Sequence, residues 1–190
     1  MTRIVSGFAG SLALQVPKSG TRPTSDRVRE AVFSALESRD AVRGARVLDL
    51  YAGSGALGLE AASRGSGAVV LVEKSAAAAS VCKRNAAAVV RSAGPGEQPS
   101  VDVRTTSALA YLTTATGRFD LVFLDPPYDA PDAELLAVLT ALVPLLAPDA
   151  LVCVERSARE GEPSVPDGLE RVYSRTYGET ALHYLEPAAG

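Results

Sequence analysis

Asp125-Pro126-Pro127-Tyr128 is the part of the sequence whose residue types are best suited to chemistry. The exocyclic amino group of a nucleic-acid base is conjugated with its ring and is a poor nucleophile. The Asp125 carboxylate and the Pro126 carbonyl can accept hydrogen bonds from such an amine and orient its lone pair toward a methyl donor. The prolines fix φ, and the Tyr128 ring offers a face on which an extruded base can stack. The tetrapeptide predicts methyl transfer to an amino nitrogen, with all four residues as catalytic candidates. The alternative interpretation is a proline-rich turn without a chemical role.

A glycine loop earlier in the chain is a candidate cofactor site. Gly53, Gly55 and Gly58 follow an apolar stretch in the spacing Gly-x-Gly-x-x-Gly. Residues without a Cβ atom let the backbone approach a ligand closely. Glu73 lies 20 residues after Gly53, where an acid can accept hydrogen bonds from ribose hydroxyls. The pattern predicts an adenosine-type cofactor, but it fits a nicotinamide dinucleotide as well as S-adenosylmethionine.

Asp49 favours S-adenosylmethionine over the dinucleotide. It precedes the glycine loop by four residues, where a carboxylate suits the charged amino group of a methionine moiety and would sit poorly beside a pyrophosphate. Ser107 could hydrogen-bond the adenine. The residues expected to bind S-adenosylmethionine are Asp49, Tyr51, Gly53, Gly55, Glu73, Lys74, Ser107 and Ala108.

The elements that must position these residues alternate between strand and helix. Apolar or alternating runs predict strands at residues 46–51, 68–73, 100–104, 119–124 and 150–155. Helical patterns separate them, at residues 56–63, 75–92, 108–114 and 131–146. This order predicts a parallel sheet covered on both faces, with ligands at the carboxyl ends of its strands. Residues 170–177 and 180–185 predict a closing antiparallel hairpin around Gly178.

The N-terminal part of the chain predicts a small basic arm. Residues 3–6 and 11–16 are expected to form a hairpin, followed by a helix that Thr24 or Ser25 caps and that ends near Ser38. We expect residues 1–20 to be this arm and residues 21–190 to be the catalytic domain. Residues 1–46 hold eight Arg and Lys against four acids, whereas the whole chain carries a net charge of −3. The asymmetry is compatible with phosphate binding by the arm, and equally with a solvated helix face.

Composition excludes several classes of protein. The chain has 190 residues, 47% of them hydrophobic, which fits one domain with a sizeable core. No apolar run approaches the roughly 20 residues of a membrane helix. No signal peptide is recognisable, so we expect a cytoplasmic protein. Cys82 and Cys153 are expected to be reduced and buried, and His183 to be structural. With one His and two Cys, a zinc site is not expected.

These motifs resemble those of the bacterial RsmD family. Asp125 to Tyr128 resembles the D/N-P-P-Y/F motif of amino methyltransferases. The segments at 22–33 (RPTSDRVREAVF) and 51–60 (YAGSGALGLE), with the turn at 177–180, resemble that family more specifically. The resemblance implies a class I S-adenosylmethionine-dependent methyltransferase, with a Rossmann-like seven-stranded sheet, a last antiparallel hairpin and a small N-terminal β-hairpin. It implies methylation of the 2-amino group of one guanine in 16S rRNA, either as naked rRNA or within an assembling small ribosomal subunit. Contacts to rRNA phosphates are expected from Arg3, Arg22, Arg27 and Arg29.

Four other functions compete with this hypothesis. A DNA amino methyltransferase acting on adenine N6 or cytosine N4 would share the tetrapeptide, but such enzymes usually carry an added target-recognition region. A glutamine methyltransferase of release factors has Asn in place of Asp125 and an extra helical domain. A nicotinamide-dependent reductase explains the glycine loop and leaves the tetrapeptide without a role. A non-catalytic RNA-binding module would need a larger aromatic surface.

Overall fold

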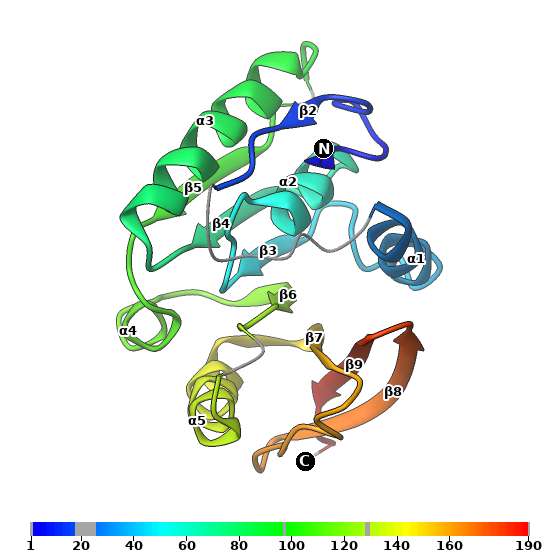
Figure 1. Cartoon of the computed structure of the whole chain (residues 1–190), viewed down its shortest axis with the longest axis vertical. Coiled ribbons are helices and arrows are strands. Elements are labelled where there is room, and N and C mark those ends of the chain that lie inside the picture. The colour runs from blue at the N-terminus through cyan, green and yellow to red at the C-terminus, as the bar shows by residue number, and fades with distance from the viewer. Residues whose placement is uncertain (1, 18–25, 97, 128–129, 190) are drawn as a thin grey trace.

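A seven-stranded sheet forms the centre of the computed structural model, which describes residues 2–17, 26–96, 98–127 and 130–189 (Figure 1). The strand order is β5-β4-β3-β6-β7-β9-β8. The strands from β5 to β7 are parallel, and β9 and β8 form an antiparallel hairpin at the edge. The strands of this sheet are β3 (Arg46–Asp49), β4 (Ala68–Val72), β5 (Ser100–Arg104), β6 (Phe119–Leu124), β7 (Leu146–Ser157), β8 (Leu169–Tyr177) and β9 (Thr180–Pro187). The predicted parallel sheet with a closing antiparallel hairpin is confirmed.

Helices cover both faces of the sheet and divide the core into two clusters (Figure 1). On one face lie α1 (Asp26–Glu37), α2 (Ala56–Ser63) and α3 (Ala76–Ser92). On the other lie α4 (Ala108–Leu112), α5 (Asp132–Leu142) and the short 3-10 helix Val143–Leu145. Strands β3 and β6 are buried on both sides along most of their length, which explains why Val47, Leu48 and the run Leu121–Leu124 are apolar. Within the described ranges, no helix is long and apolar enough to cross a membrane.

Most predicted elements have the observed bounds to within two residues, and the differences have local causes. Helix α3 begins at Ala76 because the Ser75 hydroxyl caps it, accepting a hydrogen bond from the Ala78 amide. Strand β7 is longer than predicted, since Leu146 already pairs with Phe119 across a register shift. The predicted helix 131–146 ends earlier, because Pro144 lies in the 3-10 turn that closes it. The expected cap at Thr24 or Ser25 lies outside the described residues.

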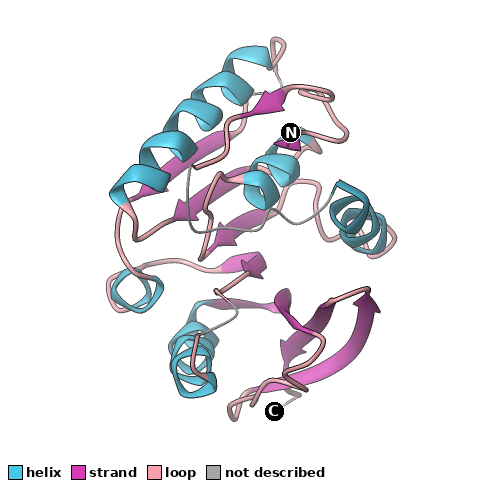
Figure 2. Ribbon diagram, in the orientation of Figure 1, coloured by secondary structure: helices cyan, strands magenta, loops and turns pink. Residues whose placement is uncertain are grey.

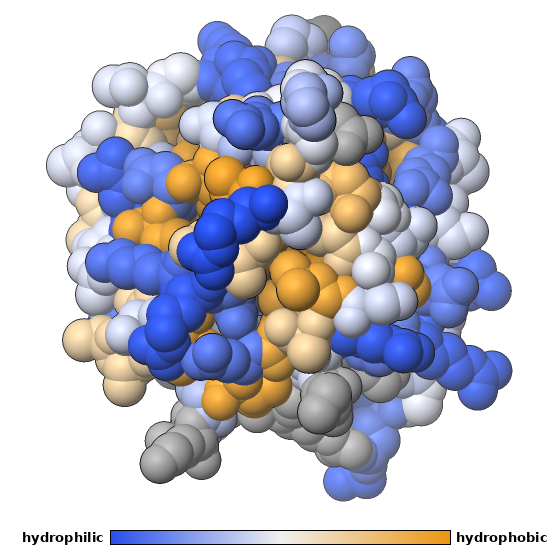
Figure 3. All heavy atoms as spheres, turned by 90° about the horizontal axis from the view of Figure 1, so that it is seen from above, coloured by the Kyte–Doolittle hydropathy of each residue, from blue (hydrophilic) through white to orange (hydrophobic). Residues whose placement is uncertain are grey.

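The N-terminal hairpin packs onto the domain and contains little regular strand. Strands β1 (Thr2–Arg3) and β2 (Ala13–Leu14) pair over two residues each, and the residues between them, like residues 15–17, form loops (Figure 2). Three of its apolar side chains, Ile4, Ala9 and Leu14, are buried in the same cluster as α1, α2 and α3. On the end of the molecule that carries the arm and α3, hydrophilic and hydrophobic side chains are interspersed (Figure 3). The arm is therefore part of the core cluster on that face of the sheet.

The carboxylate of Glu60 anchors this arm. Glu60 lies on α2 and has no exposed surface. Its oxygens accept hydrogen bonds from the Val5 amide at 2.7 Å, the Ser6 amide at 2.9 Å and the Arg64 Nε at 2.7 Å. A buried carboxylate is stable only when such donors replace its lost water.

We expect Glu60→Ala to lower the free energy of unfolding by about 3 kcal/mol, because two backbone amides and a buried guanidinium lose their acceptor. The midpoint of urea unfolding measures this loss. The matched control is Glu37→Ala, which removes the other carboxylate partner of Arg64 at a side chain that is 51% exposed; it should cost less than about 1 kcal/mol. Equal losses in the two variants would show that Glu60 does not anchor the arm.

Candidate active site

The candidate residues for cofactor binding and catalysis lie along one edge of the sheet, where the parallel strands end. Backbone hydrogen bonds beyond the strand ends hold the loops of this edge together. Leu50 donates to the Phe123 carbonyl and Ala52 donates to the Val72 carbonyl, both at 3.0 Å. The Glu73 amide donates to the Arg104 carbonyl, also at 3.0 Å. The sequence motifs after β3, β4, β5 and β6 are thus neighbours in space, as expected for the ligand-binding edge of a parallel sheet.

The glycine loop has a backbone shape that requires glycine. Gly53 and Gly55 have φ values of 53° and 83°, in the left-handed region that disfavours side chains. Gly58 serves packing, since a Cβ atom there would lie 2.3 Å from the Leu71 Cδ2 atom. The loop closes on its predicted acidic partner: the Gly53 amide donates to the Glu73 Oε2 at 2.9 Å. The other Glu73 oxygen accepts from the Ser75 amide at 2.7 Å. The structure therefore brings Gly53 and Glu73 together, and Glu73 orients the loop.

Asp49 is a buried carboxylate with spare hydrogen-bonding capacity. Its side chain is 1% exposed, and its Oδ2 accepts from the Gly58 amide at 3.0 Å. Its Oδ1 is buried without a hydrogen-bond partner among the described residues. Burial raises the pKa of Asp49 to about 7, against the lowering effect of the Gly58 and Tyr51 amides. An unpartnered buried oxygen beside a glycine loop fits a ligand that brings a hydrogen-bond donor with a positive charge, as the amino group of a methionine moiety does.

The remaining cofactor candidates are distributed around the same edge. Tyr51 is partly buried, and burial raises the pKa of its phenol to about 12. Lys74 is exposed directly after Glu73. Ser107 caps α4, its hydroxyl accepting from the Ala110 amide at 3.3 Å, and Ala108 is buried beside it. The Thr106 amide donates to the Glu73 carbonyl at 3.2 Å, which places Ser107 and Glu73 in adjoining loops.

The tetrapeptide begins where β6 ends. Asp125 is partly exposed, Pro126 is buried and Pro127 is exposed, and Tyr128 lies outside the described residues. The Pro127 carbonyl accepts from the Ala130 amide at 2.9 Å, so the segment turns toward α5. Because Asp49 pairs with Phe123, Asp125 lies two residues further along the neighbouring strand. Strand geometry then puts the Asp49 and Asp125 backbones about 8 Å apart.

The arginines expected to bind phosphates have different surroundings. Arg27 is exposed in the first turn of α1, and Arg3 is exposed but lies 3.4 Å from Asp26. Arg22 lies outside the described residues. The prediction for Arg29 is wrong: its side chain has no exposed surface, and its Nη2 donates to the Asp26 carboxylate at 2.7 Å and to the Arg3 carbonyl. Desolvation lowers the pKa of Arg29, in keeping with a structural cation that no phosphate reaches.

Asn85, which the sequence patterns do not single out, joins the arm to the cofactor loop. This side chain on α3 is 3% exposed. Its Oδ1 accepts from the Gln15 amide at 2.9 Å, and its Nδ2 donates to the Gln15 carbonyl at 2.9 Å and to the Ser54 carbonyl at 2.8 Å. Its position on the buried face of an alanine-rich helix indicates a structural role. Its partners could not be predicted, because they lie 31 and 70 residues away in the sequence.

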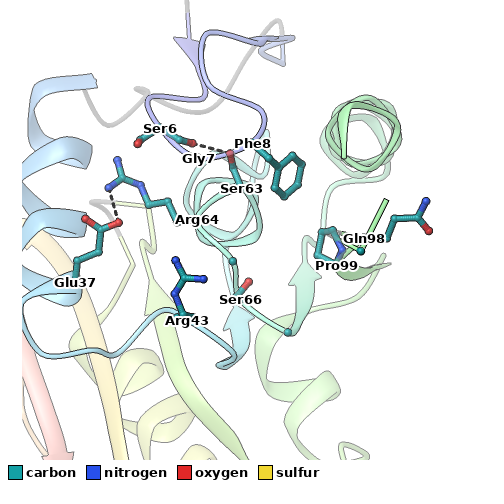
Figure 4. A pocket seen from close by; sticks show the side chains of 13 residues that line it. Ser6, Gly7, Phe8, Glu37, Arg43, Ser63, Arg64, Ser66, Gln98 and Pro99 are labelled. Carbon is teal, nitrogen blue, oxygen red and sulfur yellow. Dashed lines mark hydrogen bonds and ion pairs between the residues drawn. The ribbon is translucent and has the colours of Figure 1, made fainter. Parts of the chain in front are cut away.

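A polar cavity of about 510 Å³ lies at the opposite edge of the sheet, away from these motifs (Figure 4). The arm residues Ser6 and Phe8 border it, together with the segment after α2, where the Ser63 hydroxyl donates to the Ser6 carbonyl at 2.6 Å. Arg64 and Glu37 form an ion pair at 3.0 Å on its wall. The cavity is thus the seam between arm and domain, and it contains none of the candidate catalytic residues.

The cysteines and the histidine are buried. Cys82 and Cys153 are unbonded and buried, as predicted, and burial raises the pKa of both thiols. His183 on β9 is buried, with its Nδ1 at 2.9 Å from the Ser174 hydroxyl. Within the described ranges, no group of three or more His, Cys, Asp or Glu side chains could hold a metal ion.

Comparison with known proteins identifies relatives along nearly the whole chain. The family model described as "Conserved hypothetical protein 95" matches residues 2–186. Ribosomal RNA small subunit methyltransferase D of Escherichia coli (strain K12) is 34% identical over 188 residues, which are 98% of this chain and 90% of that protein. The solved structure of the putative methyltransferase yhhF from Escherichia coli superposes with a TM-score of 0.83 at 30% identity, covering 100% of this chain and 99% of that one.

More distant structures support the fold alone. Magnesium protoporphyrin IX methyltransferase from Synechocystis, crystallised with S-adenosylmethionine, has a TM-score of 0.64 at 16% identity, over 89% of this chain and 87% of that one. The predicted class I S-adenosylmethionine-dependent methyltransferase fold is therefore confirmed.

Proposed function

The chain belongs to the RsmD family, and from that premise we propose that it transfers the methyl group of S-adenosylmethionine to the 2-amino group of one guanine in 16S rRNA. Methyltransferase activity itself is supported by the relatives. The observation that carries the proposal is the pairing of β3 with β6: by strand geometry the backbone of Asp125 lies about 8 Å from that of Asp49, whose Oδ1 has no hydrogen-bond partner among the described residues. One edge of the sheet thus offers acceptors both for the ammonium group of a cofactor and for the amine of a substrate.

The residues of this edge divide into cofactor binding and substrate positioning. Asp49 would bind the methionine ammonium group, and Glu73 the ribose hydroxyls, while Gly53 and Gly55 allow the backbone to approach the ligand. When bound, S-adenosylmethionine supplies a methyl group on a positively charged sulfur, with no further electrophile needed. Tyr51, Lys74, Ser107 and Ala108 complete the proposed binding set.

Asp125 and Pro126 would position the guanine amine. The Asp125 carboxylate and the Pro126 carbonyl would accept hydrogen bonds from its two N–H groups, which directs the nitrogen lone pair at the methyl carbon. As the new N–C bond forms, the C–S bond breaks and its electron pair stays on sulfur. The methylated nitrogen is transiently cationic and acidic, so it loses its proton to solvent late, and Asp125 need not be a strong base. Pro127 would hold the backbone of the loop in one shape, and the Tyr128 ring would stack on the extruded guanine.

The N-terminal part of the chain, the arm together with the start of α1, would contact the rRNA outside the active site. Of the four arginines predicted to bind phosphates, Arg3 and Arg27 have exposed side chains among the described residues, and Arg22 belongs to the same proposal. A protein with net charge −3 and a small basic arm fits a substrate in which ribosomal proteins share the binding, that is, a partly assembled small subunit. Such a substrate places the protein in the cytoplasm.

Mass spectrometry of 16S rRNA nucleosides tests the proposal. Small subunits from a strain that lacks the gene should gain one 2-methylguanosine when incubated with the purified protein and S-adenosylmethionine. Duplex and single-stranded DNA serve as the alternative substrates. Methyladenine or methylcytosine in the DNA, without any change in the rRNA, would replace this proposal with that of a DNA amino methyltransferase.

A further inference from the structure

The outer strand of the closing hairpin carries an exposed surface of aromatic rings and a cation. Tyr173, Arg175 and Tyr177 alternate along β8 and therefore project from one face of the sheet. Tyr173 is 43% exposed, and Arg175 is also exposed. The Arg175 guanidinium carbon lies 5.3 Å from the centre of the Tyr177 ring. We call these three residues the tyrosine–arginine surface.

Packing fixes this surface on the side of α1. The Tyr173 ring lies 5.6 Å from that of Tyr184 on β9, and Tyr184 is buried in the core cluster that contains Phe33 of α1. Tyr177 packs against the same cluster. The rings are thus held by the core beneath them, so a ligand that stacks on them orders few flexible groups.

Arg175 differs from the other arginines around the hairpin in its charge balance. Arg156, Arg159 and Arg171 each form an ion pair, with Glu160, Glu179 and Glu162 respectively. Arg175 forms no ion pair with a carboxylate of the described residues, and its contact there is the Tyr177 ring. A cation that is not neutralised, against one aromatic ring and next to a second along the same face of the strand, suits a ligand with both flat bases and negative phosphates.

The register of the sheet relates this surface to the candidate active site. Leu124, Val154, His183 and Ser174 form one row across β6, β7, β9 and β8. Asp125 and Arg175 each follow a residue of this row, and both lie on the side of the row where the parallel strands end. Three strand spacings separate them, about 14 Å, which is the length of roughly four stacked nucleotides.

We propose that the tyrosine–arginine surface binds a single-stranded segment of the rRNA substrate beside the target nucleotide. Bases stack on Tyr173 and on the Arg175–Tyr177 pair, and the outer N–H groups of Arg175 contact a phosphate. The inference rests on the proposed rRNA substrate and adds a second contact to the arm. It accounts for the exposed aromatic and basic side chains of β8, which neither core packing nor the methyl-transfer step requires.

Steady-state kinetics with unmethylated 16S rRNA, naked and in small subunits, tests this surface. Arg175→Ala and Tyr173→Ala should each raise KM for both substrates about tenfold, with kcat and the Kd for S-adenosylmethionine unchanged. Tyr173→Phe keeps the ring and should behave as the wild type. Arg175→Ala should also lower the slope of log affinity against log salt by about 0.7, the value for one phosphate of a single strand. Arg159→Ala is the matched control, because it removes an arginine that is 81% exposed and already paired with Glu179.

Three results would overturn the inference: an unchanged KM in Arg175→Ala, an equal rise in Arg159→Ala, or a rise with small subunits but not with naked rRNA, which would assign the surface to a ribosomal protein. Failure of the proposed function is distinguishable, because the wild type would then methylate neither substrate. In that case, fluorescence anisotropy with a labelled single-stranded RNA still measures whether Arg175→Ala and Tyr173→Ala weaken binding.

Discussion

Replacing Asp125 with alanine is expected to lower kcat for methyl transfer by at least about a hundredfold, while the Kd for S-adenosylmethionine stays within twofold of the wild type. The amine of guanine is a weak nucleophile, and the loss of an acceptor that orients it acts on the transition state more than on the bound substrate. Asp125 follows the last residue of β6, whereas the groups proposed to bind the cofactor lie on the loops after β3, β4 and β5. The two functions are therefore separable.

Asp125→Asn is the informative partner of this variant. Its amide oxygen remains an acceptor at the same position, so we expect it to retain more activity than Asp125→Ala. Asp120→Ala is the control on the same strand: Asp120 lies near the opposite end of β6 and binds Arg46 there. Single-turnover transfer of a labelled methyl group measures the chemical step. Full activity of Asp125→Ala would remove Asp125 from the mechanism.

The sequence predicts the sheet and the cofactor loop well because their signals are local. The largely apolar run Phe119–Leu124 has the bounds of β6, and the predicted helix Ala56–Ser63 has those of α2. A strand, a glycine loop and a helix that follow directly on one another fix their mutual geometry over a few residues. For the same reason, the contact of Gly53 with Glu73 follows from a spacing of 20 residues and one parallel crossover.

The sequence does not predict the surroundings of the charged residues, because those depend on contacts between distant segments. Arg29 occupies a helix whose pattern leaves it free to face solvent, yet it lies under the arm with its Nη2 on the Arg3 carbonyl. Glu60 and Asn85 are ordinary polar residues in the sequence and become buried anchors of the arm, at separations of 54 to 70 residues. Counting the charge of residues 1–46 therefore overstates what the arm can offer to phosphates.

Asp49→Asn is expected to weaken S-adenosylmethionine binding about a hundredfold without unfolding the protein. The substitution preserves the shape of the side chain and removes the charge that would face the methionine ammonium group. Truncating one partner of a buried charged hydrogen bond typically costs several kcal/mol. Isothermal titration calorimetry measures the loss, with NAD as a ligand that should not bind the wild type and Asp102→Asn, an exposed carboxylate on β5, as the control. Wild-type affinity in Asp49→Asn would move the ammonium site elsewhere.

The pH dependence of cofactor binding tests the same residue independently. Burial raises the pKa of Asp49 to about 7, so its carboxyl group is largely neutral at pH 6 and largely ionised at pH 8. Only the ionised form attracts an ammonium group, so affinity for S-adenosylmethionine should fall about tenfold from pH 8 to pH 6 in the wild type and stay nearly constant in Asp49→Asn.

The stability of the protein without cofactor should depend on pH in the opposite sense. In the folded state Asp49 keeps a proton that the unfolded chain releases near pH 4, so its contribution is present below pH 4 and is lost as pH rises to about 7. Thermal unfolding at pH 5 and pH 8 should therefore show a larger loss of stability with pH in the wild type than in Asp49→Asn. If affinity for the cofactor fell together with stability as pH rises, Asp49 would act through the fold alone. If affinity rises while stability falls, the charge of Asp49 acts on the ligand.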